Sequence, residues 1–495
     1  MEIVFEKKHI TRFRESVHMS KRLQESVESV VPDTDEDIGK IVSVQSGVLL
    51  KSKDLSGRGV QVTGEARAWL LCISEGEEKL TSMRVTKPFT AEFEIAELTG
   101  EELTQVTLGV TATDARLLNP RKLSVSFELS AELCCYTTES VAASTTPAAC
   151  PGLHVLCKQE ELLLPNAVCE KSFVFSEQFP FPEGKAKPER LIGEQAEIRA
   201  EDCQLIGSKA VIKGRVEIRA AAFSVEGELT QASFTESFSQ IMDIGSETMD
   251  LCTVQPQLTG VYCELADSIS GEKVLDAEVH ILLQLVSRSR AEIRTVTDVY
   301  SNLTPVSVQT ETLRFDSAED RRTLRASVSD SVSLPEDCAD VLCVFPTLSR
   351  AALENEKFGA AVSLDILYRS ESGGLAAVRR TLTPECACGP GELRLLSVSL
   401  TEAELRPAGK SMEARVTLEG QVLGGKKSEI VSIQSVTLDE EQAFDNSSFP
   451  TLTMVRREGE SLWELAKRYH SSVEAIEAFT LPDAGGAMLL IPKAL

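Results

Sequence analysis

Alternation of apolar and polar residues runs through most of the chain and predicts β-strands. Every second residue is apolar between 123 and 133, and the same alternation returns between 412 and 422. Polar residues fill the positions between them, so one face of each strand is expected to pack in a core and the other to face water. The predicted core positions are Leu123, Val125, Phe127, Leu129, Ala131 and Leu133, with Met412, Ala414, Val416, Leu418, Gly420 and Val422.

A hairpin pattern that begins with glycine occurs three times. Its first residues are Gly64, Gly214 and Gly359, separated by 150 and 145 residues. Each first strand reaches a glycine-containing turn and is followed by a second strand, as in a β-hairpin. A repeat of this length is the size of a domain and predicts three repeated antiparallel β-domains. The three turns are Glu75-Gly76-Glu77, Glu226-Gly227-Glu228 and Ser372-Gly373-Gly374.

The period of the apolar residues changes at the end of the chain. Short strands are predicted at "TLTMV" and "MLLIP", with two helices between them. The first helix is predicted from a capping box of Ser461 and Glu464, and the second from Ser471 and Glu474. The order is therefore strand, helix, helix, strand. The predicted apolar helix faces comprise Leu462, Leu465, Ala466 and Tyr469, followed by Val473, Ile476 and Phe479.

These patterns predict a mainly β protein in which three repeated antiparallel β-domains precede a small βααβ module. Small and polar residues between the first two domains, and an acidic break before the module, are expected to be linkers. The predicted boundaries are 1–137 for the first β-domain, 138–152 for a linker, 153–300 for the second, 301–440 for the third, 441–450 for a linker and 451–495 for the module.

Composition restricts the function classes. The chain has 51 Lys and Arg residues against 76 Asp and Glu residues, a net charge of −25, which disfavours nucleic acid and anionic membranes as partners. Its longest apolar run, "VHILLQLV" at 279–286, contains Gln284 and is too short to span a membrane. The N-terminus mixes charges and lacks the order of a secretory signal, which predicts a cytosolic protein. The 13 scattered cysteines are accordingly expected to be reduced thiols.

Candidate catalytic and metal sites are poor. The sequence has no G-x-S-x-G, H-E-x-x-H or Walker A motif, and its five histidines are far apart. Cys150, His154 and Cys157, with Cys169 further along, lack the paired spacing of a tetrahedral zinc site. We therefore expect no catalytic residues, no metal, no cofactor and no enzymatic activity.

The terminal module resembles the lysin motif (LysM), which usually binds polymers of N-acetylglucosamine. The resemblance implies a binding site on two loops, formed by Gly459, Glu460, Ser461, Leu462, Trp463, Phe479, Thr480, Leu481 and Pro482. The sequence "FTL" replaces the usual N-x-L, and "AGGAMLL" replaces the usual turn, which weakens the expectation of peptidoglycan or chitin binding. Trp463 is expected to pack in the module rather than to contact a ligand. The matching residues are Val455, Gly459, Glu460, Ser461, Leu462, Trp463, Leu465, Ala466, Tyr469, Val473, Ile476, Leu481, Leu490, Ile491 and Pro492.

The three β-domains, with the acidic turn "VVPDTDEDI" at 30–38 and the glycine-led hairpins, resemble SPOCS domains of spore-coat proteins. Together with a lysin motif they resemble the SipL-like family of coat-morphogenesis proteins of Firmicutes. The resemblance implies a non-enzymatic scaffold on the mother-cell side of the forespore, binding a SpoIVA-like coat ATPase through its lysin motif and possessing contacts for other coat proteins. A cell-wall protein that binds peptidoglycan or chitin-type glycan is the alternative.

Overall fold

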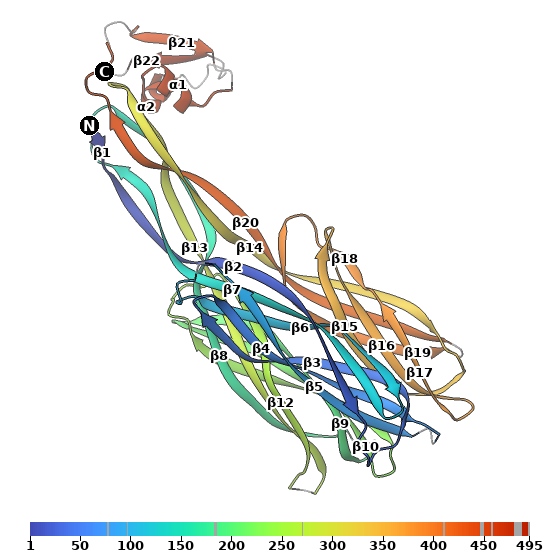
Figure 1. The fold of residues 1–495 in the computed structure, drawn as a ribbon. Coiled ribbons are helices and arrows are strands. Elements are labelled where there is room, and N and C mark those ends of the chain that lie inside the picture. Colours follow the sequence, from blue (N-terminus) through green and yellow to red (C-terminus); the bar gives the residue numbers. More distant parts are fainter. Residues whose placement is uncertain are drawn as a thin grey trace.

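The computed structural model describes residues 1–76, 79–96, 98–182, 186–269, 271–408, 411–445, 450–456, 459–479 and 488–493. Over these residues the protein is mainly β, as predicted, and is built from antiparallel sheets. Figure 1 shows an elongated molecule in which a body of sheets continues into a stalk that carries a small helical module at its end. No helix of the described residues is long and apolar enough to span a membrane.

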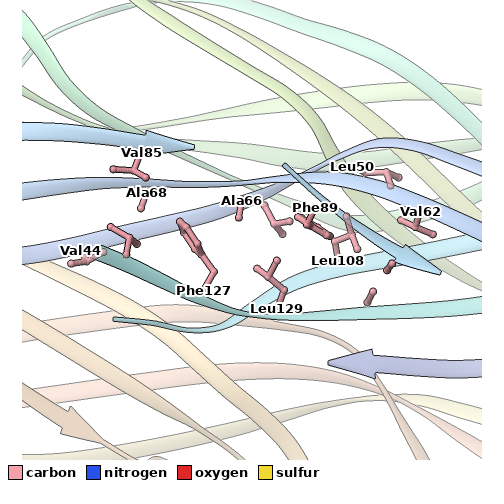
Figure 2. Packing of buried hydrophobic residues seen from close by; sticks show 14 of the residues in the cluster. Val44, Leu50, Val62, Ala66, Ala68, Val85, Phe89, Leu108, Phe127 and Leu129 are labelled. Carbon is pink, nitrogen blue, oxygen red and sulfur yellow. The ribbon is translucent and has the colours of Figure 1, made fainter. Parts of the chain in front are cut away.

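The first unit is a sandwich of two three-stranded sheets. One sheet has the order β3-β4-β5 and the other β2-β7-β6. The alternating residues of β7 face the sandwich core, and Phe127 is completely buried among them (Figure 2). Gly76, at the end of β4, has a φ of +89°, which explains why this turn needs glycine. The strands are β2 (Phe5–Val30), β3 (Ile38–Ser56), β4 (Gly59–Ser74), β5 (Leu80–Glu94), β6 (Leu103–Asn119) and β7 (Lys122–Pro147).

The second and third units repeat this arrangement, which confirms the predicted repeated β-domains. The order β9-β10-β11 faces β8-β13-β12, and the order β15-β16-β17 faces β14-β20-β19. Gly227 and Gly373 again have positive φ angles at the hairpin turns. The second unit contains β8 (Leu153–Pro180), β9 (Pro188–Ile206), β10 (Lys209–Ser224), β11 (Leu229–Asp243), β12 (Leu251–Asp267) and β13 (Lys273–Ser301). The third contains β14 (Val306–Ser333), β15 (Cys338–Glu354), β16 (Lys357–Ser370), β17 (Leu375–Leu382), β18 (Glu385–Ala387), β19 (Glu392–Ala408) and β20 (Ser411–Leu438).

The stalk is formed by the first and last long strands of each unit's β2-, β8- or β14-containing sheet, which run on beyond the sandwiches as three ribbons. The ribbons are the pairs β2–β7, β8–β13 and β14–β20, and β1 (Glu2–Ile3) pairs with β20 near the far end. Figure 1 shows β13, β14 and β20 running together towards the terminal module. Apolar side chains from all three ribbons pack between them, including Ala143, Ile293 and Ile430.

Three buried hydroxyl side chains join the ribbons at one level of the stalk. Ser144 Oγ donates to the carbonyl oxygen of Ile433 at 2.7 Å, and Thr295 Oγ1 donates to the carbonyl oxygen of Ser144 at 3.1 Å. Thr295 Oγ1 also lies 2.8 Å from Ser432 Oγ. Each unit thus supplies one hydroxyl from its last strand.

The stalk corrects the prediction of a linker at 138–152. Residues up to Pro147 belong to β7, so only the end of the predicted linker lies between strands, and the first unit extends past the predicted boundary at 137. The small residues of this segment, such as the buried Ala143 and Ser144, permit close packing of three ribbons. Composition alone does not distinguish a tightly packed strand of small residues from a flexible linker. The predicted ends at 300 and 440 lie close to the ends of β13 and β20.

The terminal module has the predicted βααβ order. It comprises β21 (Leu452–Arg456), α1 (Leu462–Arg468), α2 (Val473–Phe479) and β22 (Met488–Pro492), with β21 and β22 antiparallel. The predicted core residues Leu465, Ala466 and Ile476 are fully buried. Of the predicted linker 441–450, residues 446–449 lie outside the described residues, and the others form no helix or strand.

Candidate partner-binding site

The first predicted loop leads into α1 through a complete capping box. Ser461 Oγ accepts a hydrogen bond from the Glu464 amide at 3.2 Å, and the Glu464 carboxylate accepts one from the Ser461 amide at 2.8 Å. These hydrogen bonds hold the pKa of Glu464 below its usual range. Gly459 has a φ of +91°, so the approach to the helix favours glycine. Glu460 is held by an ion pair with Arg468.

The second predicted capping box is wrong by one residue. Ser472 caps α2, because its Oγ accepts from the Ala475 amide at 3.1 Å. Ser471 is instead buried, and its hydroxyl donates to the carbonyl oxygen of Pro492. Adjacent serines offer the same capping chemistry, and the packing of α2 on β22 decides which one is used.

Trp463 packs against the stalk, not only inside the module as predicted. Its ring meets Tyr300 of β13 edge to face, with 4.7 Å between ring centroids, and its Nε1 donates to Asp298 Oδ2 at 2.8 Å. Lys467 Nζ donates to both carboxylate oxygens of Asp298 at 2.8 Å. The indole is therefore engaged by another domain of the same chain.

Tyr300 completes this contact. Its hydroxyl donates to the carbonyl oxygen of Ser471 at 2.9 Å, and its ring stacks on His154 of β8 at 4.9 Å. Burial raises the pKa of Tyr300 and lowers that of His154, so both side chains are neutral at pH 7. The core of the module includes Tyr300, which makes the stalk end a structural part of the module's packing.

A β-bulge brings Asp298 and Tyr300 to this position. The register of β13 against β8 shifts between Val296 and Asp298. Val296 and Val299 consequently both point into the stalk core, whereas Asp298 and Tyr300 face the module. Alternation along "TVTDVY" could not reveal this, because a bulge changes which face each residue takes.

The predicted site residues differ in their exposure to solvent. Gly459 and Ser461 are exposed, and Phe479 exposes 52% of its surface at the end of α2. Leu462 packs against the module core and Trp463 against the stalk. Thr480, Leu481 and Pro482 lie outside the described residues.

Further exposed apolar side chains were not predicted. Leu452, Met454 and Met488 are 46%, 64% and 45% exposed on the outer face of the β21–β22 sheet, whose inner face buries Leu489 and Ile491. The alternation within "TLTMV" could have shown them, since Leu452 and Met454 share the face opposite to Val455. An apolar outer surface next to polar loops is typical of a protein interface.

Among the described residues one group has donor atoms close enough to suggest a metal site, namely His18, Glu132 and Cys134. Arg394 Nη2 lies 2.8 Å from Glu132 and 2.7 Å from Cys134 Sγ, so a guanidinium cation already fills this position. Burial raises the pKa of Cys134 to about 12, which opposes the thiolate that a metal requires. The group does not suit a metal ion.

The ion pair at Asp298 predicts that acid weakens the contact between the module and the stalk. Burial alone would raise the pKa of Asp298, but Lys467 and Trp463 outweigh it and hold the pKa below the usual range. The stabilisation is thus complete above the unfolded pKa of about 3.9 and is lost as pH falls through the lower folded value. Because the carboxylate is a third exposed, we expect a contribution of only about 1 kcal/mol.

Trp463 emission in a Trp69→Phe background would measure this weakening of the contact. We expect a red shift on acidification below about pH 4. Asp298→Asn should already weaken the contact at neutral pH and abolish the acid transition. An unchanged transition in Asp298→Asn would show that another group controls the contact.

Comparison with known proteins adds no relative. A scan against protein-family models, a search of curated proteins and a search of solved structures each found no match. The interpretation of the terminal module therefore depends on its residue pattern and on the observed βααβ order.

Proposed function

We propose that the chain is a non-enzymatic adaptor of endospore coat assembly, whose terminal module binds a SpoIVA-like coat ATPase at the forespore surface. The observation that carries this proposal is the exposure of several large apolar side chains of the module at the far end of the stalk. Phe479, Met454 and Met488 remain open to solvent there although the module's own core is complete. Exposed Met and Phe side chains suit a protein partner better than they suit a hydroxyl-rich glycan.

The stalk supports the same role. It separates the module from the three sandwiches, so one partner could be held at the module while the sheets contact other coat proteins (Figure 1). The contact of Trp463 and Lys467 with Asp298 fixes how the module is presented. A fixed orientation lowers the entropy cost of binding compared with a module on a flexible tether.

Replacing Phe479 by Ala is expected to weaken capture of the ATPase by roughly ten- to a hundredfold, or about 1–3 kcal/mol, as for a central apolar anchor. Binding would be measured by surface plasmon resonance with the full chain, after circular dichroism has confirmed the fold. Glu477→Ala, an exposed change on the same helix, is the matched control and should leave the affinity unchanged.

The same preparations would be tested with chitin oligomers and insoluble peptidoglycan. Firm glycan binding together with unchanged ATPase capture by Phe479→Ala would contradict the adaptor role. That result would favour a glycan-binding protein of the cell wall.

A further inference from the structure

A cleft of about 880 Å³ lies at the base of the stalk, where the three units meet. Strands from every unit line it, notably β2 and β7 of the first, β13 of the second, and β19 and β20 of the third. It lies away from the terminal module and shares no residue with the proposed partner-binding surface. A ligand here would contact the whole three-unit body.

Most charges that line the cleft are paired with one another. Arg394 binds Glu15 at 3.0 Å and Glu132 at 2.8 Å, and His18 lies 3.4 Å and 2.8 Å from the same two carboxylates. Tyr136 also donates its hydroxyl to Glu15 at 3.2 Å. These contacts leave little capacity on either carboxylate for a further cation.

The other lining pairs are similarly complete. Lys427 pairs with Glu392 at 2.9 Å, while Arg12 and Arg14 both pair with Glu139 at 2.7 Å and 3.2 Å. The remaining acidic side chain, that of Asp316, belongs to an exposed residue. One buried charged side chain of the cleft lining is left without an ion pair among the described residues, and it is a cation.

That cation is Arg288 of β13. It is only 6% exposed, and its Nη1 donates to Thr253 Oγ1 at 3.0 Å. Within the described part of the chain no carboxylate lies within 4.0 Å of its guanidinium. Burial lowers the pKa of Arg288, and the nearby Arg394 cation acts in the same direction, while Glu15 attracts the guanidinium from beyond ion-pair distance. An unpaired buried cation is costly unless an anion accompanies it.

Among the described residues, two further donors near the cleft are unsatisfied, while one carboxylate oxygen beside the lining residue Gly424, that of Asp320, is an unsatisfied acceptor. Arg394 Nε is buried without an acceptor in the described structure, and so is the amide nitrogen of Gln105. Gln105 lies on the same face of β6 as Thr107, which lines the cleft. Donors without acceptors, around a buried guanidinium, suit a ligand that offers oxygen acceptors.

We infer that the cleft binds a small oxyanion, a phosphate or carboxylate group, held by the guanidinium of Arg288. The planar guanidinium matches two oxygens of either group, and its remaining N–H donors are available after the bond to Thr253. Because strands from all three units line the cleft, the bound anion stabilises their arrangement.

The test is calorimetric titration of the full chain with sodium phosphate and, separately, sodium acetate, at constant ionic strength maintained with chloride. Arg288→Met, which keeps the length of the side chain without its charge, should weaken oxyanion binding by roughly ten- to a hundredfold. Arg290→Met is the matched control, because Arg290 is exposed on the same strand and pairs with Glu161. It should bind as the wild-type chain does.

The outcomes separate clearly. Binding of phosphate alone assigns a phosphate group, and binding of acetate alone assigns a carboxylate. Binding of neither by the wild-type chain, or equal binding by Arg288→Met, would overturn the inference. Should Arg288→Met fail to fold, Arg288→Lys keeps the charge without the two-pronged geometry, and it must still weaken binding for the inference to stand.

Discussion

Replacing Phe127 by Ala is expected to lower the free energy of unfolding of the first unit by about 3–5 kcal/mol, the range for large-to-small changes of buried aromatic residues. Phe127 is completely buried in the middle of β7, between the two sheets (Figure 2). The neighbouring core side chains Leu108, Leu129 and Val44 belong to extended strands on both sheets, which cannot close a cavity by rotating. Most of the cavity should therefore remain.

Guanidinium unfolding followed by tryptophan fluorescence would measure this loss. The chain has two tryptophans, so a Trp463→Phe background leaves Trp69 of β4, which reports the first unit together with its contact to Phe345 of the third. Phe479→Ala removes the same atoms from an exposed position and should change the midpoint little. A loss below about 1 kcal/mol for Phe127→Ala would mean that the sandwich core can rearrange.

Gln284→Leu is expected to cost about 2–6 kcal/mol, because it removes two hydrogen bonds that join the first two units. Gln284 Nε2 donates to the carbonyl oxygen of Val106 at 2.8 Å, and its Oε1 accepts from the Val106 amide at 2.8 Å. The side chain thus satisfies both backbone groups of a residue in β6, although it belongs to β13. Leucine would leave both groups buried without a partner.

Hydrogen exchange of the Val106 amide is the most direct measurement. Loss of its protection, together with lower stability of the first unit, is the expected result for Gln284→Leu. Gln178→Leu is a suitable control, because Gln178 is exposed on β8 and its side chain donates to Asp276 at the surface. If Val106 stayed protected in Gln284→Leu, another acceptor would have to replace the lost amide.

The repeated units and the terminal module were predictable because their signals are local. Alternation places Leu123 and Leu133 on one face of a strand whatever that strand pairs with, and both residues are fully buried. The glycine turns follow from a positive φ at Gly76, Gly227 and Gly373, a requirement of the hairpin itself. Ser461 and Glu464 likewise complete their capping box within one helical turn.

The candidate site was only partly predictable. The loop residues Gly459 and Ser461 are exposed as a binding site requires, whereas the partner of Trp463 is Asp298, far away along the chain. A single bulge in β13 decides that Asp298 and Tyr300 face the module. The spacing of apolar and polar residues near the bulge does not reveal its position.

By itself, the sequence determined the β class, the three-fold repetition, the core face of β7 and of β20 and the order of the terminal module, because each depends on neighbouring residues and on the burial of apolar surface. Only the tertiary structure decided how the units meet. It converted the supposed linker after residue 137 into a stalk strand and gave Gln284 a backbone partner in another unit. It also buried Arg288 with no carboxylate of the described residues within ion-pair distance. These polar contacts depend on the distance and direction between atoms of remote segments, and alternation along a strand contains no information about either.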